Sequence, residues 1–417
     1  MIAIPLPSFA RARREPVRAS IGDGPGAHRI LHVFRAPVGG LFRHVVDLVR
    51  LQAAAGHAVG IVCDASTGGE RAAQALADLE PLLALGVLRV PMRRNPDLSD
   101  LRTIAAVRDR AEAVGATVLH GHGAKGGCYA RLAPVETDGP LIRAYTPHGG
   151  SYNYRPGTAL HRLYMGVERL LSWRTDVFLF ESEYVAARHA TYVGETDRLR
   201  RIVHNGIAEG EFEPVVAARD RFDLVYIGEL RDAKGVPYLL DALAAMRAQG
   251  RSLTMLLVGS GPDAVSLAAH AERLGLRGAV TFEPPQPIRP VLARGSVMVV
   301  PSLAESLPYV VLEAAAACQP MVATNVGGIP EIFGAAADDL VPSRDAAALA
   351  VGIARILDEA PETRAARFSA LSASVRARFS MTRMGADVLS GYAAALRAQA
   401  ERRAVGATVP ARERAPR

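Results

Sequence analysis

Short apolar runs alternate with segments of helical periodicity along most of this chain. The first run, RILHVF at residues 29–34, is followed by Gly39 and Gly40, a helical pattern that ends near Ala54, and a second apolar run, AVGIVC. Parallel strands need crossover helices of this kind, so the alternation predicts parallel α/β layers. It stops at the polar, proline-containing segment 209–220 and then starts again. We therefore expect two doubly wound domains that face a cleft.

The length of 417 residues also favours two domains, because one hydrophobic core rarely grows that large. The last helical pattern, MTRMGADVLSGYAAALRAQ, has no strand after it. Both ends are rich in arginine, which predicts poorly ordered tails. The expected parts are a flexible tail at 1–27, a first Rossmann-like domain at 28–205, a second at 206–380, a lone helix at 381–400 and a basic tail at 401–417.

Composition narrows the partners of such a protein. Apolar residues make up 49% and charged residues 22%, which is typical of a soluble globular protein. The formal net charge of +7 favours nucleotide phosphates, acidic lipid surfaces or nucleic acid, although a chain that simply places arginine on every exposed face explains it equally well. The only lysines, Lys125 and Lys234, both lie beside glycines, where a compact ammonium group could meet phosphate.

Cysteine usage and the N-terminal residues bear on the compartment. The three cysteines are scattered and lack CxxC spacing, which argues for a reduced cytosolic compartment and against a metal cluster. The first residues carry their arginines after the apolar part, the wrong order for a signal peptide. Because no apolar run reaches about eighteen residues, we expect no membrane span and a cytoplasmic protein.

The stretch from Val299 to Glu331 contains two glutamates separated by seven residues, Glu305 and Glu313. An apolar strand ends at Pro301, so Glu305 is expected in the following loop and Glu313 in the next helix. A second strand, MVAT, then leads through the glycine-rich turn NVGGIPE into another helix. Two helix N-termini and two carboxylates are thus predicted at the edge of the sheet where α/β proteins bind ligands.

Several motifs occur in a fixed order. They are GGLFRH at 39–44, TPHG at 146–149, HNGI at 204–207, GELRDAKG at 228–235, VGSGP at 258–262, and Glu305 to Glu313 with EAAAACQPMVAT and GGIPE after it. This ordered set resembles the retaining glycosyltransferases of family 4, which have the GT-B fold. The likeness extends over about residues 28–400 and implies that the last helix returns to the first, acceptor-side domain. The second domain would then bind a nucleotide sugar.

The resemblance implies roles for residues of the second domain. The glutamate at Glu313 would bind both ribose hydroxyls, because a carboxylate accepts two hydrogen bonds. Glu305 would reach hydroxyls of the donor sugar, and Lys234 would hold the diphosphate and stabilise its negative charge. One position departs from the family, since Glu229 stands where arginine is common, and Arg231 is the alternative cation. The remaining donor-binding residues implied are Gly228, Gly259, Gly261, Ser306, Leu307, Pro308 and Tyr309.

The first domain would supply the other wall of the site. The histidine of TPHG, His148, is placed by the resemblance near the donor sugar and the reacting carbon, with a satisfied core histidine as the alternative. The glycines Gly39 and Gly40 would let backbone approach the donor phosphates or the acceptor, or else form only a tight turn. The motif HGHGAKGG predicts a phosphate or acceptor loop rather than a zinc site, because no carboxylate is near. Its acceptor-side candidates are His120, His122 and Lys125.

The implied reaction transfers a sugar from a nucleoside diphosphate to an acceptor hydroxyl with retention of anomeric configuration. No D-x-D motif occurs, so we expect neither a metal nor a cofactor beyond the donor substrate. The expected acceptor is a glycan or lipid-linked glycan in bacterial exopolysaccharide, lipopolysaccharide or glycolipid synthesis. A nicotinamide enzyme would need GxGxxG after the first strand, and a nucleic-acid-binding protein would need clustered basic and aromatic residues; neither pattern is present.

The segment HRLYMGVERLLSWR at 161–174 combines arginine, tyrosine and tryptophan. Such a helix could rest on an anionic membrane. The interpretation we favour from the pattern is an ordinary helix of the first domain that buries Leu163, Val167 and Leu170.

Overall fold

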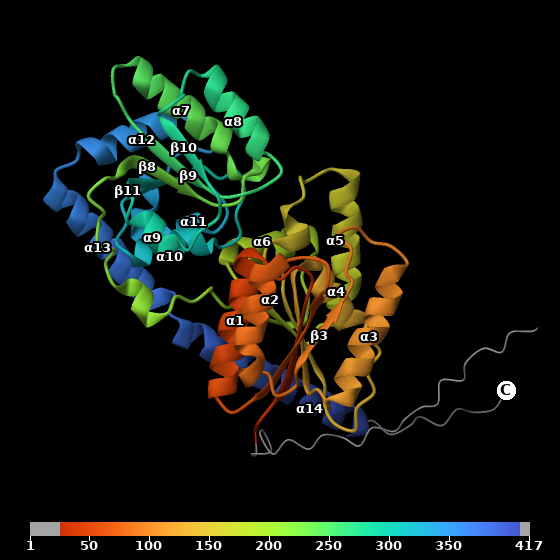
Figure 1. Cartoon of the computed structure of the whole chain (residues 1–417). Helices are drawn as coiled ribbons and strands as arrows, with labels where there is room; N and C mark the ends of the chain where they lie inside the picture. Colours follow the sequence, from red (N-terminus) through yellow and green to blue (C-terminus); the bar gives the residue numbers. More distant parts are fainter. Residues whose placement is uncertain (1–25, 409–417) are drawn as a thin grey trace, which may run out of the picture.

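The computed structural model describes residues 26–408, in two parallel sheets flanked by helices (Figure 1). Most of the two predicted tails, 1–25 and 409–417, lies outside the described residues. The apolar runs of the sequence form the strands, and the central strands of both sheets are almost completely buried, whereas three edge strands are partly exposed. Burial on both faces is what a parallel sheet covered by crossover helices requires.

The first sheet has seven parallel strands in the order β3-β2-β1-β4-β5-β6-β7. Its strands are β1 (Arg29–Phe34), β2 (Ala58–Asp64), β3 (Val87–Val90), β4 (Val118–His122), β5 (Ile142–Thr146), β6 (Val177–Phe180) and β7 (Leu199–Ile202). The helices of this domain are α1 (Gly39–Ala54), α2 (Gly69–Leu79), α3 (Ser99–Ala113), α4 (Gly123–Leu132), α5 (Ala159–Ser172) and α6 (Glu183–Tyr192).

The second sheet has five parallel strands in the order β10-β9-β8-β11-β12. Its strands are β8 (Phe222–Ile227), β9 (Met255–Val258), β10 (Val280–Glu283), β11 (Gly295–Val300) and β12 (Met321–Ala323). The helices are α7 (Val236–Ala248), α8 (Ala264–Arg273), α9 (Ile288–Leu292), α10 (Tyr309–Ala316), α11 (Ile329–Phe333), α12 (Ala346–Asp358) and α13 (Pro361–Arg378). One large hydrophobic core joins this sheet to its helices.

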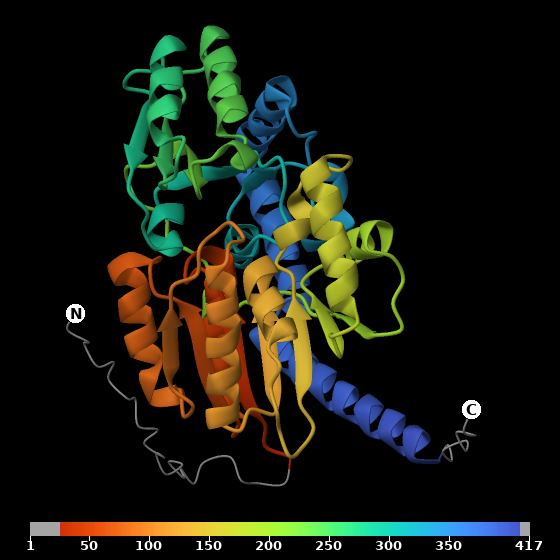
Figure 2. The same cartoon turned by 90° about the vertical axis from the view of Figure 1, so that its right-hand side faces the viewer.

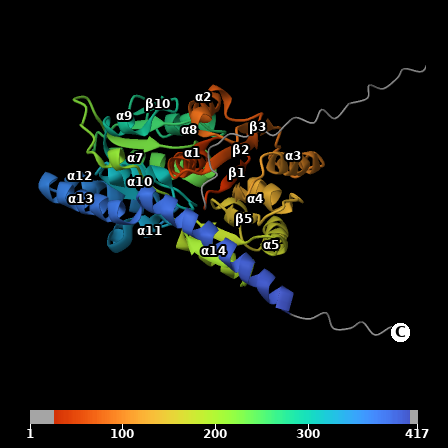
Figure 3. The same cartoon turned by 90° about the horizontal axis from the view of Figure 1, so that it is seen from below.

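The last helix, α14 (Met381–Thr408), leaves the second domain and packs on the sheet of the first (Figures 2 and 3). Val388 and Tyr392 of this helix are buried in one cluster with Ile30 and Val177 of the first sheet. The predicted fold of two Rossmann-like domains with a returning C-terminal helix is therefore confirmed. The helix is longer than expected, because it continues past residue 400 into the part assigned to the basic tail.

One prediction for α5 is wrong. Leu163 and Leu170 were expected in the core, but they are 62% and 70% exposed, and Val167 is also exposed. The helix buries its other side, where Met165 and Leu171 pack inward. Helical spacing shows that α5 is amphipathic without showing which side faces the protein. Within the described residues, no helix combines the length and hydropathy needed to cross a membrane.

Candidate active site

The carboxyl ends of strands from both sheets contribute to one region between the domains. The loop after β11 contains Glu305 and contacts the first domain, where the Asn205 side-chain amide donates to the Leu307 carbonyl oxygen at 2.8 Å. Gly40, at the start of α1, lies against Tyr309, since an added Cβ atom would be 3.3 Å from that ring. Predicted residues of both domains therefore meet across the same interface.

A glycine turn holds the loop that carries Glu305. Gly327 has φ +61°, and an added Cβ atom would lie 1.8 Å from the Glu305 carbonyl oxygen. The next glycine donates its backbone N–H to the Ser306 carbonyl oxygen at 2.9 Å. Only glycine combines this conformation with so close an approach. The motif NVGGIPE follows β12, which is the neighbour of β11 in the sheet. Its glycines can therefore pack directly against the loop after β11 that carries Glu305.

Lys234 and Glu305 form one hydrogen-bonded unit. The Lys234 ammonium donates to Glu305 Oε1 at 2.6 Å, and the Ser302 hydroxyl donates to the same oxygen at 2.7 Å. The two residues come from the turns after β8 and β11, which are adjacent strands. A phosphate bound at Lys234 would therefore lie beside Glu305.

Glu313 forms an ion pair that the sequence did not suggest. Arg43 of α1 donates to Glu313 across the domain interface and also donates to Glu211 at 2.7 Å. Its guanidinium lies 4.5 Å from the centre of the Tyr309 ring. Burial raises the pKa of Glu313, and the charge of Arg43 opposes that shift. The motif GGLFRH contains Arg43, but no local pattern indicates that its partner is 270 residues away.

Arg231, the alternative to the arginine that is missing at position 229, pairs with Glu229 itself. Its Nε atom lies 2.9 Å from a carboxylate oxygen of Glu229, and both side chains are about half exposed. Among the implied glycines, Gly259 lies so close to Gly228 that an added Cβ atom would be 1.9 Å from its carbonyl oxygen. Gly261 similarly approaches the Leu230 backbone. These glycines let two turns of the second domain pack together. This packing requires glycine whether or not the same residues also bind the donor.

On the first domain, His148 follows β5 with a positive φ of 52°. Its Nε2 atom lies 3.1 Å from Nδ1 of His122, the last residue of β4. Burial lowers the pKa of His148 well below its usual value, and His44 lowers it further. The structure therefore brings together His148 and His122 from two separate motifs.

The motif HGHGAKGG is not the loop that was predicted. His120 and His122 belong to β4, and Lys125 lies in α4, because the helix begins directly after the strand. His120 is hydrogen-bonded to Tyr392 at 2.7 Å and to Thr146 at 2.9 Å, and its ring packs on that of His122. The Lys125 ammonium donates to both Asp100 carboxylate oxygens at 2.6 Å. Among the residues that the structure describes, His122 is the one member of this set that is hydrogen-bonded to a predicted site residue.

Two acidic residues at the interface were missed. Glu181 follows β6 and is fully buried; burial raises its pKa to about 7, although N–H groups of His148 and Gly149 favour its charged form. In the sequence, its position at the end of an apolar strand could have marked Glu181 as a candidate site residue. Glu331 accepts the backbone N–H groups of Glu183 at 2.9 Å and Tyr184 at 2.8 Å. It caps a helix of the opposite domain, where a negative charge is favourable.

Comparisons with known proteins agree with this arrangement. Residues 38–210 match the family described as Glycosyltransferase Family 4, and residues 221–359 match Glycosyl transferases group 1. The chain belongs to the family 4 glycosyltransferases. The enzyme class predicted from the ordered motifs is thereby confirmed.

Individual relatives share about a third of their residues with this chain, over about half of its length. The D-inositol 3-phosphate glycosyltransferase of Segniliparus rotundus is 32% identical over 236 residues, which are 51% of each chain. The α-D-kanosaminyltransferase of Streptomyces kanamyceticus is 30% identical over 41% of this glycosyltransferase and 45% of that protein. The chain thus spans about half the length of these relatives. The structure of Anabaena Alr3699/HepE in complex with UDP-glucose has a TM-score of 0.71 and 19% identity over 89% of this chain and all of that one, a likeness of fold.

Proposed function

We propose that this glycosyltransferase moves a sugar from a nucleoside diphosphate sugar to an acceptor hydroxyl and retains the anomeric configuration. The observation that carries the proposal is the Lys234–Glu305 pair at 2.6 Å, which places one cation beside one carboxylate at the carboxyl edge of the second sheet. A diphosphate needs the cation, and a sugar hydroxyl needs the acceptor oxygen. The complex of a similarly folded protein with UDP-glucose supports this class of donor.

The proposed roles follow from charge and position. Lys234 binds the diphosphate, so that charge on the leaving group is stabilised without a metal. Glu305 orients the donor sugar, and Glu313 accepts from the ribose hydroxyls once Arg43 shares or releases it. In a front-face reaction the bond from the anomeric carbon to the phosphate oxygen breaks as the acceptor oxygen attacks. The acceptor proton passes to the departing phosphate, which explains retention without a covalent enzyme intermediate.

Donor binding tests the role of Glu313. We expect UDP-, GDP- or ADP-sugar to raise the Tm of the wild-type protein, whereas NAD and an oligonucleotide do not. Glu313→Ala should weaken the affinity for the effective donor at least about tenfold, because two charge-assisted hydrogen bonds are lost. The exposed Glu209, which pairs with Arg376, offers the matched control Glu209→Ala. A Tm increase with NAD or nucleic acid alone contradicts the proposed function.

The acceptor is proposed to be a glycan or lipid-linked glycan of bacterial surface polysaccharide or glycolipid synthesis, reached at the inner face of the cytoplasmic membrane. The exposed side of α5 supports this location, since it presents Leu163, Val167 and Leu170 together with Arg162 and Arg169. An amphipathic helix with arginine beside an apolar stripe suits an anionic lipid surface.

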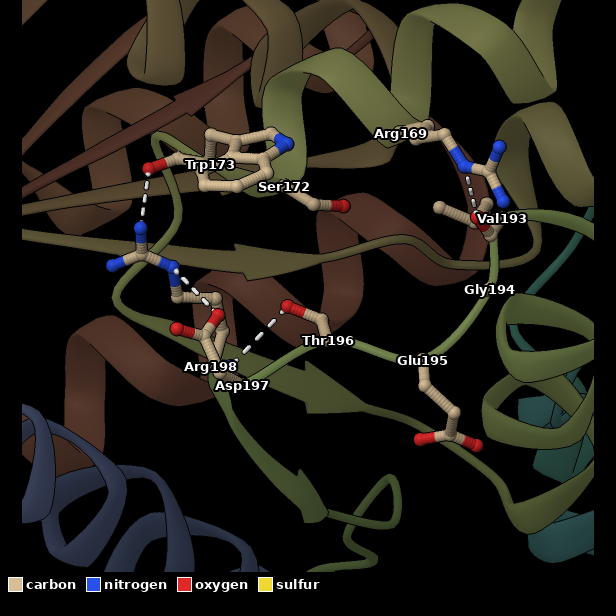
Figure 4. Close-up of a pocket in the computed structure, with 9 residues that line it drawn as sticks. All are labelled: Arg169, Ser172, Trp173, Val193, Gly194, Glu195, Thr196, Asp197 and Arg198. Carbon is tan, nitrogen blue, oxygen red and sulfur yellow. Dashed lines mark hydrogen bonds and ion pairs between the residues drawn. The ribbon is translucent and has the colours of Figure 1, made fainter.

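A small pocket adjoins the C-terminal end of α5 (Figure 4). It has a volume of about 300 Å³ and is lined by Arg169 and Arg198 beside the exposed Trp173. Arg169 Nε donates to the Val193 carbonyl oxygen at 2.8 Å, which holds the guanidinium at the rim. The carboxylates of Glu195 and Asp197 also line this pocket, and Asp197 lies 3.5 Å from Arg198, so the charges of the lining are balanced. The proposed membrane contact therefore depends on α5 and on the exposed indole of Trp173 at its end, and not on the pocket.

Vesicle sedimentation tests this contact. The wild-type protein should bind vesicles that contain anionic lipid, and binding should fall as salt rises. The double variant Leu163→Asp, Leu170→Asp should bind about tenfold more weakly, because it places charge in the apolar stripe. Val265 on α8 is 84% exposed, so Val265→Asp is a matched control that should bind normally. Equal binding by all three proteins, or a dimer that only the double variant loses, contradicts the lipid contact.

A further inference from the structure

Four side chains inside the first domain form a continuous chain of hydrogen bonds that ends at His148. Gln52 Oε1 lies 2.8 Å from His32 Nε2, and His32 Nδ1 lies 2.9 Å from His122 Nε2. His122 Nδ1 then lies 3.1 Å from His148 Nε2. The first three residues are fully buried and come from α1, β1 and β4. Of these four residues, only His148 was expected near the donor sugar, and the roles proposed above involve none of them.

Each imidazole in the chain is neutral at physiological pH. Burial lowers the pKa of His32 to about 4 and lowers the pKa values of His122 and His148 well below the usual value. A neutral imidazole has one N–H donor and one acceptor nitrogen. The direction of the first hydrogen bond therefore determines the direction of every later one.

Gln52 sets that direction. Its amide nitrogen donates to the Tyr392 hydroxyl at 3.3 Å, so its oxygen faces His32 and can only accept. His32 must then donate from Nε2 and accept at Nδ1 from His122. By the same rule His122 accepts at Nδ1 from His148, which places the His148 proton on Nε2 and its lone pair on Nδ1.

We infer that Gln52, His32 and His122 are positioning residues that hold His148 in the Nε2–H tautomer, with Nδ1 as an acceptor for a hydroxyl of the bound donor. This inference rests on the proposed function. The following residue, Gly149, lies against the loop of Glu305, because an added Cβ atom would be 3.1 Å from Ser306 Cβ. Beyond Gln52 the hydrogen bonds continue to Tyr392 and His120, but the intervening amide neither takes up nor passes on a proton. The chain therefore orients His148 and does not conduct protons.

A metal site is the competing use of the same rings. Nitrogens of His44, His122 and His148 lie within 4.8 Å of one another, and His44 Nε2 is buried without a partner in the described part of the chain. The His122 and His148 ring centres are 5.4 Å apart with their nitrogens at 3.1 Å. The nitrogens thus lie nearly on the line between the rings, as in a hydrogen bond, whereas ligands of one ion converge on a point beside that line. The geometry favours the hydrogen-bonded chain.

The test combines a spectrum with kinetics. In long-range 1H–15N spectra of histidine-labelled protein, His148 should show the Nε2–H tautomer. Gln52→Met removes the acceptor that sets the direction, so we expect mixed tautomers at His148 and about a tenfold fall in kcat/KM, the factor typical of one buried hydrogen bond. Gln319→Met is the matched control, because it removes a buried glutamine of the second domain whose amide donates to the Gly295 carbonyl oxygen at 3.0 Å, away from the histidines. Its His148 spectrum and kcat/KM should match the wild type.

Three outcomes overturn the inference. The first is an Nδ1–H tautomer at His148 in the wild type, and the second is a Gln52→Met protein with unchanged spectrum and kinetics. The third is stoichiometric Zn²⁺ binding by the wild type that His122→Asn abolishes, which would establish a metal site instead. The spectrum needs no substrate, so a chain that is present in a protein without transfer activity would contradict the proposed function rather than the tautomer.

Discussion

Lys234→Ala should lower kcat by about 10²–10³-fold while the protein remains folded. Lys234 is proposed as the cation that stabilises the departing diphosphate, and removing one such group from a preorganised site typically costs that factor. The effect should fall on kcat, because the charge develops as the bond to the phosphate breaks. Steady-state kinetics at saturating donor measure it, with circular dichroism as the check on folding.

Two variants separate this role from a general loss of charge. Lys234→Arg keeps a cation next to Glu305 and should recover part of the activity. Arg251→Ala removes an arginine whose exposed ion pair with Asp358 lies elsewhere on the second domain, and it should leave kcat unchanged. A Lys234→Ala enzyme with wild-type kcat would show that the diphosphate is held by other residues.

The second large effect is loss of stability in mild acid. Five histidines of one cluster, His32, His44, His120, His122 and His148, have pKa values lowered from 6.5 by burial. Elsewhere in the first domain burial also lowers the pKa of His189, to about 4, which adds to the same effect. In the unfolded chain they bind protons near pH 6.5, but in the folded protein they remain neutral well below it. The unfolded state therefore binds more protons, and stability falls as pH falls below 6.5.

The loss in free energy of unfolding can be estimated from the number of histidines. Each group costs about 1.4 kcal/mol per pH unit, so five groups cost about 7 kcal/mol one unit below pH 6.5. Glu181, with a pKa raised to about 7, Asp47, with a pKa raised to about 6, and Glu313, whose pKa is also raised, act in the opposite direction, because the folded state binds their protons first. These three groups offset only part of the loss from the histidines, and the remaining loss is a large share of the stability of a domain.

Guanidinium unfolding followed by circular dichroism at pH 7.5, 6.5 and 5.5 measures this loss. We expect the midpoint of the first domain to fall steeply between pH 6.5 and 5.5. The second domain serves as an internal control, since residues 207–417 contain a single histidine, His270. Equal stability of the first domain at pH 7.5 and 5.5 would mean that the cluster is already protonated or exposed.

The sequence predicted the fold because local patterns settle it. The apolar run Val297–Val300 falls within the buried strand β11, and the two-domain alternation determines the order of strands and helices. It also predicted the turns that hold Lys234 and Glu305, because adjacent parallel strands bring their carboxyl ends together. Their contact is a consequence of sheet order, which a sequence pattern can reveal.

Other features depend on contacts between distant residues. The Arg43–Glu313 pair and the capping of α6 by Glu331 both cross the domain interface. The histidine chain joins residues from separate elements. His122 and His148 were candidates from their motifs, whereas no pattern pointed to His32 or Gln52. The exposed face of α5 was assigned to the wrong side for a related reason, since amphipathicity does not tell which partner an apolar stripe contacts.

Mass spectrometry of the reaction products tests the central claim most directly. The wild-type protein is incubated with a panel of UDP-, GDP- and ADP-sugars and a bacterial lipid-linked glycan extract, with and without EDTA. We expect one acceptor to gain the mass of a single sugar as an equal amount of nucleoside diphosphate is released, and EDTA to change neither. Donors that all remain intact, or transfer that stops when EDTA is added, would contradict the account.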